Sequence, residues 1–588
     1  IDTPIRVAHL GISSVVSIVD DLLLERVREH YSRLFHLPYE KIYRFTEDGR
    51  ARRTTAYLDM LHEIVRRKME AVRNLPFFQP NDKTKYFELL PDEHPLKRDY
   101  QRMLEMQPGP ECEALQADLT KRMVPGEFDV NIMTKIDRLN VDKAGHLLSD
   151  EYSDAKASLR GFANSAAAGA VEFSAGLNRG LFNYITRFRD FYRNETGAIK
   201  KKIILKVSDF RSALVQGKIL AKNGLEVHEF RIESGLNCGG HAFASNGYLL
   251  PMLLREFREK RDQLKAEFQP MVMKFYESMG WHYHDDAHKA EPIITVQGGI
   301  GINGEDRRMR EQFGMDRTGW ATPFLLVPEA TCVDNATREQ LCRATEEDVY
   351  LSDASPLGVP FNNLRNTGSE VWTRTKAEKG NPGSGCPKGF LVTNTEFSET
   401  PICTAATEYQ KQKLAQAASD SCSDTDRKEH VEKVLVKTCL CEHLANSALI
   451  ALGITQASRA PQAVCPGPNI AWFDRLYSLQ EMVDHIYGRR PSLVPAERPH
   501  MFAKEIVMYV DYFEKLVHRC TYTQREVSTL REYYENLEQG MNECLSIALS
   551  KPYKEENLSS IPPTVKEQRK RLRDIVARFE HEATAIAA

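Results

Sequence analysis

The stretch EVHEFRI-ES-GLNCGGHAF, residues 226–243, is the part of the sequence that decides the fold. Its first seven residues have the apolar and β-branched pattern of a strand. They lead into a turn from Gly235 to Phe243 that holds three glycines, Cys238 and His241. Glycines at this density allow positive φ and let a ligand approach the backbone closely. The pattern predicts a ligand site at the end of a β-strand; the alternative is an ordinary strand-to-helix turn with an incidental histidine.

Similar strand patterns recur in the first 330 residues, and helical periodicity separates most of them, for example at 211–222 and 249–279. The strands are expected at 5–10, 128–133, 169–175, 202–207, 226–232, 292–297 and 320–326. Repeated β-then-α order with short glycine-marked turns is typical of a parallel sheet, either a barrel or a doubly wound sheet. Seven strands can be counted, and an eighth could lie within 40–122. We therefore predict an α/β fold, a TIM (β/α)8 barrel.

The length of 588 residues predicts two or three domains. We expect the barrel in residues 1–340, with a mostly helical insertion at about 40–122. Residues 351–402 are rich in Gly, Pro, Ser, Thr and Asn, so 341–402 is interpreted as an irregular connecting segment. Helical periodicity and clustered cysteines predict an α-helical C-terminal domain in 403–588.

Composition limits the classes of function. With 42% hydrophobic and 27% charged residues and a net charge of -3, the chain is typical of a soluble globular protein. It has no global positive charge that would attract nucleic acid or an anionic membrane, and no apolar run long enough to span a bilayer. The 12 cysteines are too dilute for a disulfide scaffold, which favours a cytoplasmic protein. The sequence leaves the oligomeric state open, a homo-oligomer included.

Several glycine-rich or polar turns follow the expected strands. They are Gly11-Ile12, Asn131–Met133, Ser174–Asn178, Gly235–His241 and Gly298–Gly301. In a TIM barrel such turns meet at the carboxyl ends of the strands, where active sites lie. The backbone N–H groups of Gly298–Gly301 could bind a phosphate at a helix start. The next expected strand, near Thr318–Thr322, strengthens this interpretation because barrels often bind phosphate after their last two strands.

These turns, in this order, resemble those of the nitronate monooxygenase and flavin-dependent enoyl-acyl-carrier-protein reductase family, whose members are FMN-binding TIM barrels. Residues 130–133 (VNIM) resemble the family's GVNIM strand, and 235–241 (GLNCGGH) resemble its GxEAGGH turn. Residues 296–301 (VQGGIG) resemble its AAGGI strand and phosphate turn, and 321–324 (ATPF) stand where the family has GTRF. The likeness covers about residues 1–35 and 125–335.

The resemblance implies FMN as cofactor, with His241 as the catalytic histidine beside the flavin. It implies that Asn131, Gly11 and Ile12 line the ring and that Gly299, Gly301 and Thr322 hold the phosphate. The other implied cofactor contacts are Gly176, Gly239, Gly240, Gly298 and Ala321. Cys238 is a second catalytic candidate, as a general acid in place of or beside His241, or else a small buried filler.

Departures from the family pattern indicate a remodelled substrate pocket. Asn237 and Cys238 replace the family's Glu-Ala, Ala321 replaces a glycine, and the family's second strand is not recognisable. We expect an FMN-dependent oxidoreductase that passes a hydride between flavin and a small-molecule or carrier-bound substrate, with NAD(P)H as candidate electron donor. The alternatives are a nitronate monooxygenase-type oxidase that uses oxygen, and a flavin-free scaffold whose helical tail binds a partner.

A second candidate site lies among the late cysteines Cys403, Cys439, Cys441 and Cys465. Four thiolates suit a [4Fe–4S] cluster, and zinc accepts the same ligands. Cys386 or Cys422 could replace one member of the set. The alternative is a group of buried free thiols in a helical subdomain.

Overall fold

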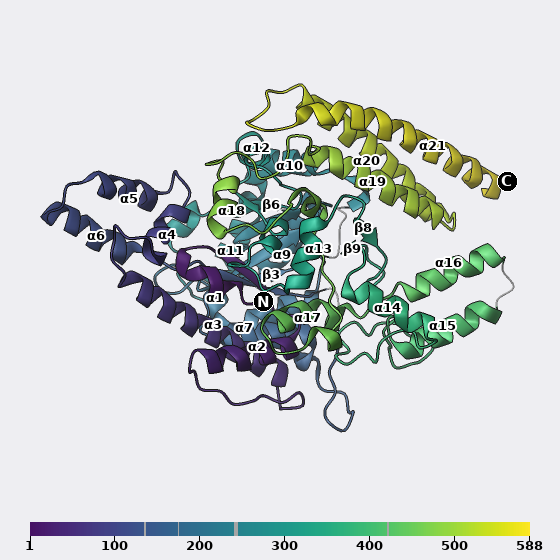
Figure 1. Cartoon of the computed structure of the whole chain (residues 1–588), viewed down its shortest axis with the longest axis horizontal. Helices are drawn as coiled ribbons and strands as arrows, with labels where there is room; N and C mark the ends of the chain where they lie inside the picture. Colours follow the sequence, from purple (N-terminus) through teal and green to yellow (C-terminus); the bar gives the residue numbers. More distant parts are fainter. Residues whose placement is uncertain (135–136, 175, 240–244, 420–422, 588) are drawn as a thin grey trace.

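The computed structural model describes the chain except residues 135–136, 175, 240–244, 420–422 and 588. At its centre, seven strands of the described chain form one sheet in which every neighbouring pair is parallel and the strands follow one another in chain order (Figure 1). They are β1 (Ser14–Ser17), β2 (Phe128–Ile132), β3 (Gly169–Phe173), β4 (Lys201–Val207), β5 (Glu229–Glu233), β6 (Ile293–Gln297) and β7 (Arg317–Gly319). This confirms the predicted α/β class and the sequential strand order of a TIM-like fold. No eighth strand joins this sheet within the described residues.

Helices connect most of the strands. They are α2 (Asp21–Leu34), α7 (Asp154–Asn164), α8 (Arg179–Tyr184), α9 (Phe210–Lys222), α10 (Leu250–Glu259), α11 (Arg261–Ser278) and α12 (Asn303–Arg307). One face of the strands, which includes Val130, Ile132, Phe230, Ile232 and Val296, belongs to the main hydrophobic cluster with all of these helices except α12. Side chains alternate between the two faces of a strand, so the remaining positions turn to the other face of the sheet.

Two strand predictions are wrong. Residues 5–10 form α1 (Thr3–Val7) and a 3-10 turn (Ala8–Leu10), and 320–326 contain a 3-10 helix (Thr322–Leu326). Both helical segments have a proline at their first positions, where its fixed φ favours a helix start. A short apolar run that is buried on all sides cannot be assigned to strand or helix from periodicity alone. The first strand therefore begins only at Ser14, after Gly11 and Ile12.

The insertion is helical, as predicted. It contains α3 (Gly49–Arg73), α4 (Asp82–Leu89), α5 (Pro95–Glu105) and α6 (Pro110–Arg122). The long helix α3 packs on α2 and α7, whereas α4, α5 and α6 extend away from the sheet (Figure 1). They enclose a small hydrophobic cluster that includes Phe77, Phe87, Tyr100 and Met103.

The segment 341–402 is more regular than predicted. It contains an antiparallel hairpin, β8 (Val349–Ser352) with β9 (Phe361–Leu364), and the helix α14 (Gly368–Glu378). Some of its polar residues cap helices. At the start of α14, the hydroxyl of Thr367 accepts from the N–H of Glu370 at 3.3 Å. Helix caps and loops use the same residue types, so the composition of this segment predicted an irregular connection where a hairpin and a helix form.

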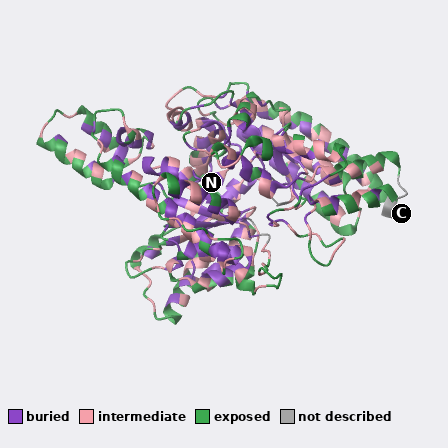
Figure 2. Cartoon of the chain, turned by 60° about the horizontal axis from the view of Figure 1, so that its bottom comes forward, coloured by how far each residue is buried: buried purple, intermediate pink, exposed green. Residues whose placement is uncertain are grey.

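The remaining C-terminal elements are helices. They are α13 (Asn335–Arg343), α15 (Thr407–Ser419), α16 (Asp424–Leu435), α17 (Leu440–Ala451), α18 (Leu479–Ile486), α19 (Met501–His518), α20 (Gln524–Ala548) and α21 (Ile561–Ala587). Helices α19, α20 and α21 pack together, and their apolar side chains share the main hydrophobic cluster with the sheet. Figure 2 shows the buried residues gathered in the middle of the molecule and the exposed ones toward its outlying helices.

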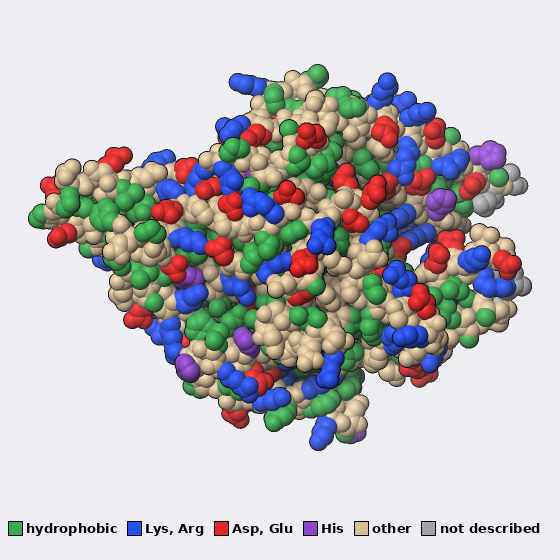
Figure 3. Space-filling view, in the orientation of Figure 1, with side chains coloured by type: hydrophobic (Ala, Val, Ile, Leu, Met, Phe, Trp, Pro, Cys, Tyr) green, Lys and Arg blue, Asp and Glu red, His purple; other side chains and the backbone are tan. Residues whose placement is uncertain are grey.

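Among the described residues no single helix is long and apolar enough to cross a bilayer, although α16 and α17 pass that test as a pair bent by 47°. On the face drawn in Figure 3, basic and acidic side chains are interspersed.

Candidate functional site

The face of the sheet opposite the hydrophobic cluster carries charged and amide side chains. In the strand register, Asn131 lies beside Glu172, Lys206 beside Arg231, and Glu233 beside Gln297. The interior of a TIM barrel is usually filled by branched apolar residues. Burying a charged side chain is unfavourable unless the charge is paired. A charged face inside the sheet is therefore the candidate functional site.

Arg231 pairs with three acids. Its guanidinium donates to Glu229 at 2.8 Å and to Glu172 at 3.0 Å, and it lies 3.9 Å from Asp129. Burial raises the pKa of Asp129 to about 6, although the N–H of Ala170 and the charge of Arg231 lower it. Burial likewise raises the pKa of Glu172, and Arg231 and Lys206 offset only part of that effect. Carboxyls of this cluster therefore take up a proton at a higher pH than exposed carboxyls do.

Lys206 and Glu233 lie nearest the carboxyl ends of the strands. The Lys206 Nζ atom is 3.3 Å from Glu233 Oε1 and 3.8 Å from Glu172 Oε1. The side-chain amides of Asn237 and Gln297 both donate to Glu233 Oε1, each at 2.7 Å. Glu233 thus links the end of β5 to the turn that follows it and to the end of β6.

Three polar side-chain atoms on the sheet have no partner in the described chain: Ser14 Oγ, Asn131 Oδ1 and Thr295 Oγ1. All three atoms are buried and accept or donate no hydrogen bond there. An unsatisfied buried polar group costs about 1–3 kcal/mol, so such atoms are usually satisfied by water or a ligand. Asn131 was predicted to line the ring of a cofactor.

The glycine turn after β6 packs against the turn after β5. Gly298 and Gly299 have φ of 98° and 86°. A Cβ on Gly298 would lie 2.9 Å from Asn237 Cα, and one on Gly299 would lie 2.6 Å from Leu236 Cδ1. Both positions therefore require glycine, for conformation and for space.

Gly301 has a different environment. Its N–H donates to Glu305 at 2.8 Å, and a Cβ on it would lie 2.6 Å from the guanidinium of Arg498. The N–H group predicted to hold a phosphate is thus bonded to a carboxylate of the protein itself. It would become available to a phosphate only if Glu305 turned away.

C-terminal segments cover the same edge of the sheet. The N–H of Gly239 donates to Cys465 Sγ at 3.0 Å, and the amide of Asn362 donates to the carbonyl of Asn237 at 3.0 Å. A Cβ on Gly467 would lie 2.6 Å from Thr322 Oγ1 and 3.5 Å from the Cys238 nitrogen. Burial raises the pKa of the Cys238 thiol to about 11, so the thiol is protonated at neutral pH.

The structure brings many of the predicted residues together at the carboxyl ends of the strands. These are Asn131, Cys238, Gly239, Gly298, Gly299, Gly301 and Thr322. Ala321 directly precedes Thr322, and Gly176 follows β3 beside a small cavity of about 310 Å³. Gly240 and His241 lie outside the described residues.

Gly11 and Ile12 are not part of this group. They precede β1, and a Cβ on Gly126, just before β2, would lie 2.0 Å from the carbonyl oxygen of Ile12. They therefore lie at the amino ends of the strands. The prediction failed because residues 5–10, expected to be the strand before them, are helical.

Sequence reasoning missed Glu172, Lys206, Glu233 and Gln297. A signal was present in the run EFRIE, 229–233, where charged residues stand at every second position. Such alternation places all three charges on one face of the strand.

The predicted metal ligands separate into two places. Cys465 lies at Gly239, whereas Cys403 and Cys441 pack in a small cluster with Cys386. The charge of Cys386 also acts on Cys439 and Cys441. Cys422 lies outside the described residues. Among the described residues, the cysteine cluster included, no three His, Cys, Asp or Glu groups meet in a metal-binding arrangement.

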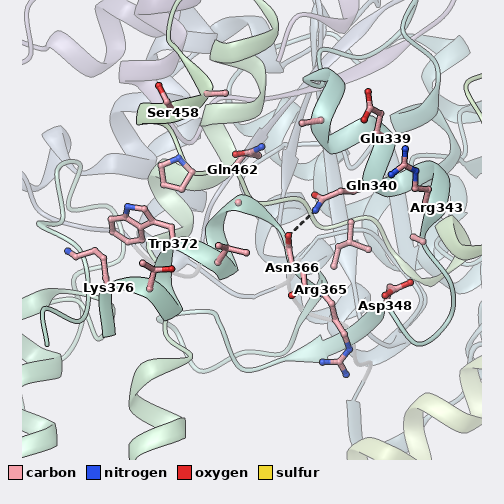
Figure 4. A pocket seen from close by; sticks show the side chains of 18 of the residues that line it. Glu339, Gln340, Arg343, Asp348, Arg365, Asn366, Trp372, Lys376, Ser458 and Gln462 are labelled. Atoms are coloured by element: carbon pink, nitrogen blue, oxygen red, sulfur yellow. Dashed lines mark hydrogen bonds between the residues drawn. The ribbon is translucent and has the colours of Figure 1, made fainter. Parts of the chain in front are cut away.

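Two large cavities lie away from the glycine turns. One, of about 1010 Å³, lies between α13, α14 and residues 457–462 and is lined by Arg343, Trp372 and Lys376 (Figure 4). The other, of about 1030 Å³, is lined by residues 44–53, 137–148 and 388–401. Its lining includes Arg44, Arg138 and Lys388 and reaches the edge of the cysteine cluster.

No protein-family model matches this chain, and no curated protein matches it. The likeness to the nitronate monooxygenase and enoyl reductase family stays a prediction from the sequence.

Proposed function

We propose that this protein is an FMN-dependent oxidoreductase, a reductase that acts on a small-molecule or carrier-bound organic substrate. The proposal includes a complete (β/α)8 barrel, a helical C-terminal domain and a cytoplasmic location. The observation that supports it best is the polar group at the carboxyl ends of the strands, where Asn131 has a buried oxygen without a described partner. Active sites of parallel α/β folds lie at this edge.

The residues present fit a flavin in part. Asn131 offers an unsatisfied polar atom, and Gly239, with φ of 109°, has open space where a side chain would stand. Gly301 fits less well because its N–H is bonded to Glu305. In this proposal Asn131, Gly239 and Gly299 contact the cofactor, and Thr322 contributes its hydroxyl.

Bound FMN would supply the acceptor and donor of a hydride. Lys206, held by Glu233, places a positive charge at the strand ends, where it stabilises negative charge on a neighbouring ligand. The protonated thiol of Cys238 and the imidazole of His241 are the proposed proton donors. NAD(P)H is the proposed electron donor.

An absorption spectrum of the anaerobically purified full-length protein tests the proposal, together with measurement of FMN released on denaturation. A flavin spectrum that bleaches with NAD(P)H supports the reductase. Bleaching with a nitroalkane alone supports the nitronate monooxygenase-type oxidase. A protein that contains no FMN and binds none when FMN is added contradicts both.

Two variants make this test specific. Asn131→Leu and Lys206→Met are expected to lose bound FMN or to slow its reduction. Lys200→Met is the matched control, because Lys200 forms an exposed pair with Asp190 at 2.7 Å. Equal FMN content together with equal rates of FMN reduction in all three variants would contradict the proposed site.

The flavin-free scaffold has one specific observation in its favour, the bond between Gly301 and Glu305 in the predicted phosphate turn. An iron–sulfur or zinc centre at the late cysteines stays a prediction, and metal analysis of the same preparation tests it.

A further inference from the structure

The cavity between α13, α14 and residues 457–462 differs in charge from the rest of the protein. Its lining contains five basic and two acidic side chains, although the whole chain has a net charge of -3. The acidic residues are Glu339 and Asp348, and the basic residues are Arg343, Arg365, Lys376, Lys379 and Arg459. The cavity therefore has an excess of three positive charges.

Carboxylates of the protein do not neutralise this excess. Other basic residues of the C-terminal region pair with acids, as Arg475 does with Glu481 at 3.0 Å. In the part of the chain that the structure describes, none of the five basic residues of the cavity lies within ion-pair distance of a carboxylate. The carboxylate of Asp348 instead accepts from the N–H and the hydroxyl of Thr345, at 2.9 and 2.8 Å. Positive charges around one hollow raise the local concentration of anions, so the cavity favours a negatively charged ligand.

One wall of the cavity, the connection from β9 to α14, is held in place by neighbouring groups. The side-chain amide of Gln340 on α13 donates to the carbonyl of Asn366 at 2.8 Å (Figure 4). The guanidinium of Arg365 lies 4.3 Å from the centroid of the Tyr350 ring, and its Nε donates to the carbonyl of Glu347 at 2.9 Å. Arg365 is thus oriented by a ring and a carbonyl, neither of which removes its charge.

Trp372 gives the cavity a flat apolar surface. In Figure 4 it lies with Lys376 on one side of the cavity, and Arg343 lies on the other. The Lys376 ammonium lies 4.8 Å from the centroid of the Trp372 ring, and the His443 ring meets that ring edge-on with centroids 5.1 Å apart. These contacts fix the orientation of the indole, and aromatic side chains of this kind stack with nucleic-acid bases.

Size and chemistry together indicate the class of ligand. The volume of about 1010 Å³ is large enough for a small molecule of several rings and charged groups. Arginine guanidinium groups bind phosphates through pairs of hydrogen bonds. A nucleoside diphosphate or triphosphate combines a flat base with a polyanion that offsets the excess positive charge.

We propose that this cavity binds a nucleoside diphosphate or triphosphate, with its phosphates beside Arg343 and Arg365 and its base against Trp372. Lys379 and Arg459 add to the positive field around the phosphates. The site is separate from the glycine turns and does not depend on the proposed flavin chemistry.

Calorimetric titration of the full-length protein with ADP, without added divalent metal, tests the proposal. We expect wild type to bind ADP and the Arg343→Gln and Arg365→Gln variants to bind it about tenfold more weakly, because each loses a charged hydrogen-bond donor. Arg52→Gln is the matched control, because Arg52 is an exposed arginine on α3 outside the cavity, and its affinity should equal that of wild type.

Pyrophosphate is the probe that separates the base from the phosphates. Trp372→Leu should weaken the binding of ADP and leave that of pyrophosphate unchanged. Retained pyrophosphate binding also shows that this variant is folded. Equal affinities of wild type for ADP and pyrophosphate would overturn the nucleotide and indicate a site for phosphate alone.

Three further results would overturn the proposal. One is the absence of ADP binding by wild type, and the second is equal ADP affinity in wild type and both arginine variants. In the second case, loss of ADP binding in Asn131→Leu would place the nucleotide at the proposed flavin site instead. The third is a short single-stranded RNA that binds more tightly than ADP and depends on the same arginines, because the ligand would then be a nucleic acid.

Discussion

The guanidinium of Arg498 donates to the carboxylate of Glu305 at 2.7 Å, and both side chains are buried. The same carboxylate accepts from the N–H groups of Gly301 and Met501, at 2.8 and 2.9 Å. Arg498 also donates to the carbonyl of Gly299 at 2.8 Å. This pair therefore joins the glycine turn after β6 to the start of α19, almost 200 residues later.

Replacing Arg498 should destabilise the protein strongly. Burial by itself raises the pKa of Glu305, but Arg498 and His500 outweigh it and the net pKa is lowered. Arg498→Met would leave a buried carboxylate uncompensated, which costs about 3–5 kcal/mol in the free energy of unfolding. Urea denaturation at pH 7 measures this.

The control for that measurement is Arg307→Met. Arg307 forms an exposed pair with Glu311 at 2.8 Å, and such pairs contribute about 0–1 kcal/mol. Similar losses in the two variants would show that the buried pair does not hold the turn to α19.

Replacing Arg231 should cause a loss of stability that grows with pH. Arg231→Met removes the cation that Glu229, Glu172 and Asp129 share. The folded pKa of Asp129 is already raised to about 6, and without Arg231 it rises further above its unfolded value. A carboxyl with a raised folded pKa stabilises the fold at low pH and loses that contribution as pH rises. The unfolding free energy of the variant should approach that of wild type at pH 5 and fall below it at pH 8; a constant difference would contradict the pairing.

Gly299 should not tolerate a side chain. Gly299→Ala places a Cβ at 2.6 Å from Leu236, in a backbone with φ of 86°. The left-handed conformation alone costs about 1–2 kcal/mol, and the contact adds to it. Gly109→Ala is the control, because a Cβ there meets no atom within 4 Å. Thermal unfolding should separate the two variants, and equal melting temperatures would mean that the turn can relax.

The sheet was predictable because its strands have different patterns on their two faces. Val130, Ile132, Phe230 and Ile232 mark the face that packs on helices, and their spacing is visible in the sequence. The exceptions were the short segments at 5–10 and 320–326, where Pro4 and Pro323 start helices. Short apolar runs carry too few residues for periodicity to separate strand from helix.

The site was only partly predictable because its members come from distant segments. Gly298 and Gly299 could be found as glycines after a strand, yet nothing in their neighbourhood indicates that Arg498 and Glu305 would meet beneath Gly301. The sequence predicted Cys465 in the cysteine cluster, whereas the structure places Cys386 there and Cys465 at Gly239, for the same reason. A backbone bridge between 384 and 406 creates that cluster, and no local spacing reports it.

Glu505 makes the turn before His241 sensitive to pH. This carboxyl on α19 accepts from the N–H of Leu250 at 2.9 Å, and burial raises its pKa from 4.5 to about 7, although bonds from Gly235 and Ser234 lower it. Because the folded pKa lies above the unfolded one, the protonated group is favoured, and its contribution to stability is lost as pH rises through about 7.

Glu505→Gln keeps the hydrogen-bonding shape of the side chain but cannot ionise. Its free energy of unfolding relative to wild type should therefore increase between pH 5 and pH 9, by at most about 3 kcal/mol. Urea denaturation at pH 5, 7 and 9 measures this, with the exposed Glu497→Gln as control. A relative stability that stays flat or falls with pH would mean that Glu505 is ionised in the folded protein, with its charge compensated at the Ser234–Gly235 turn.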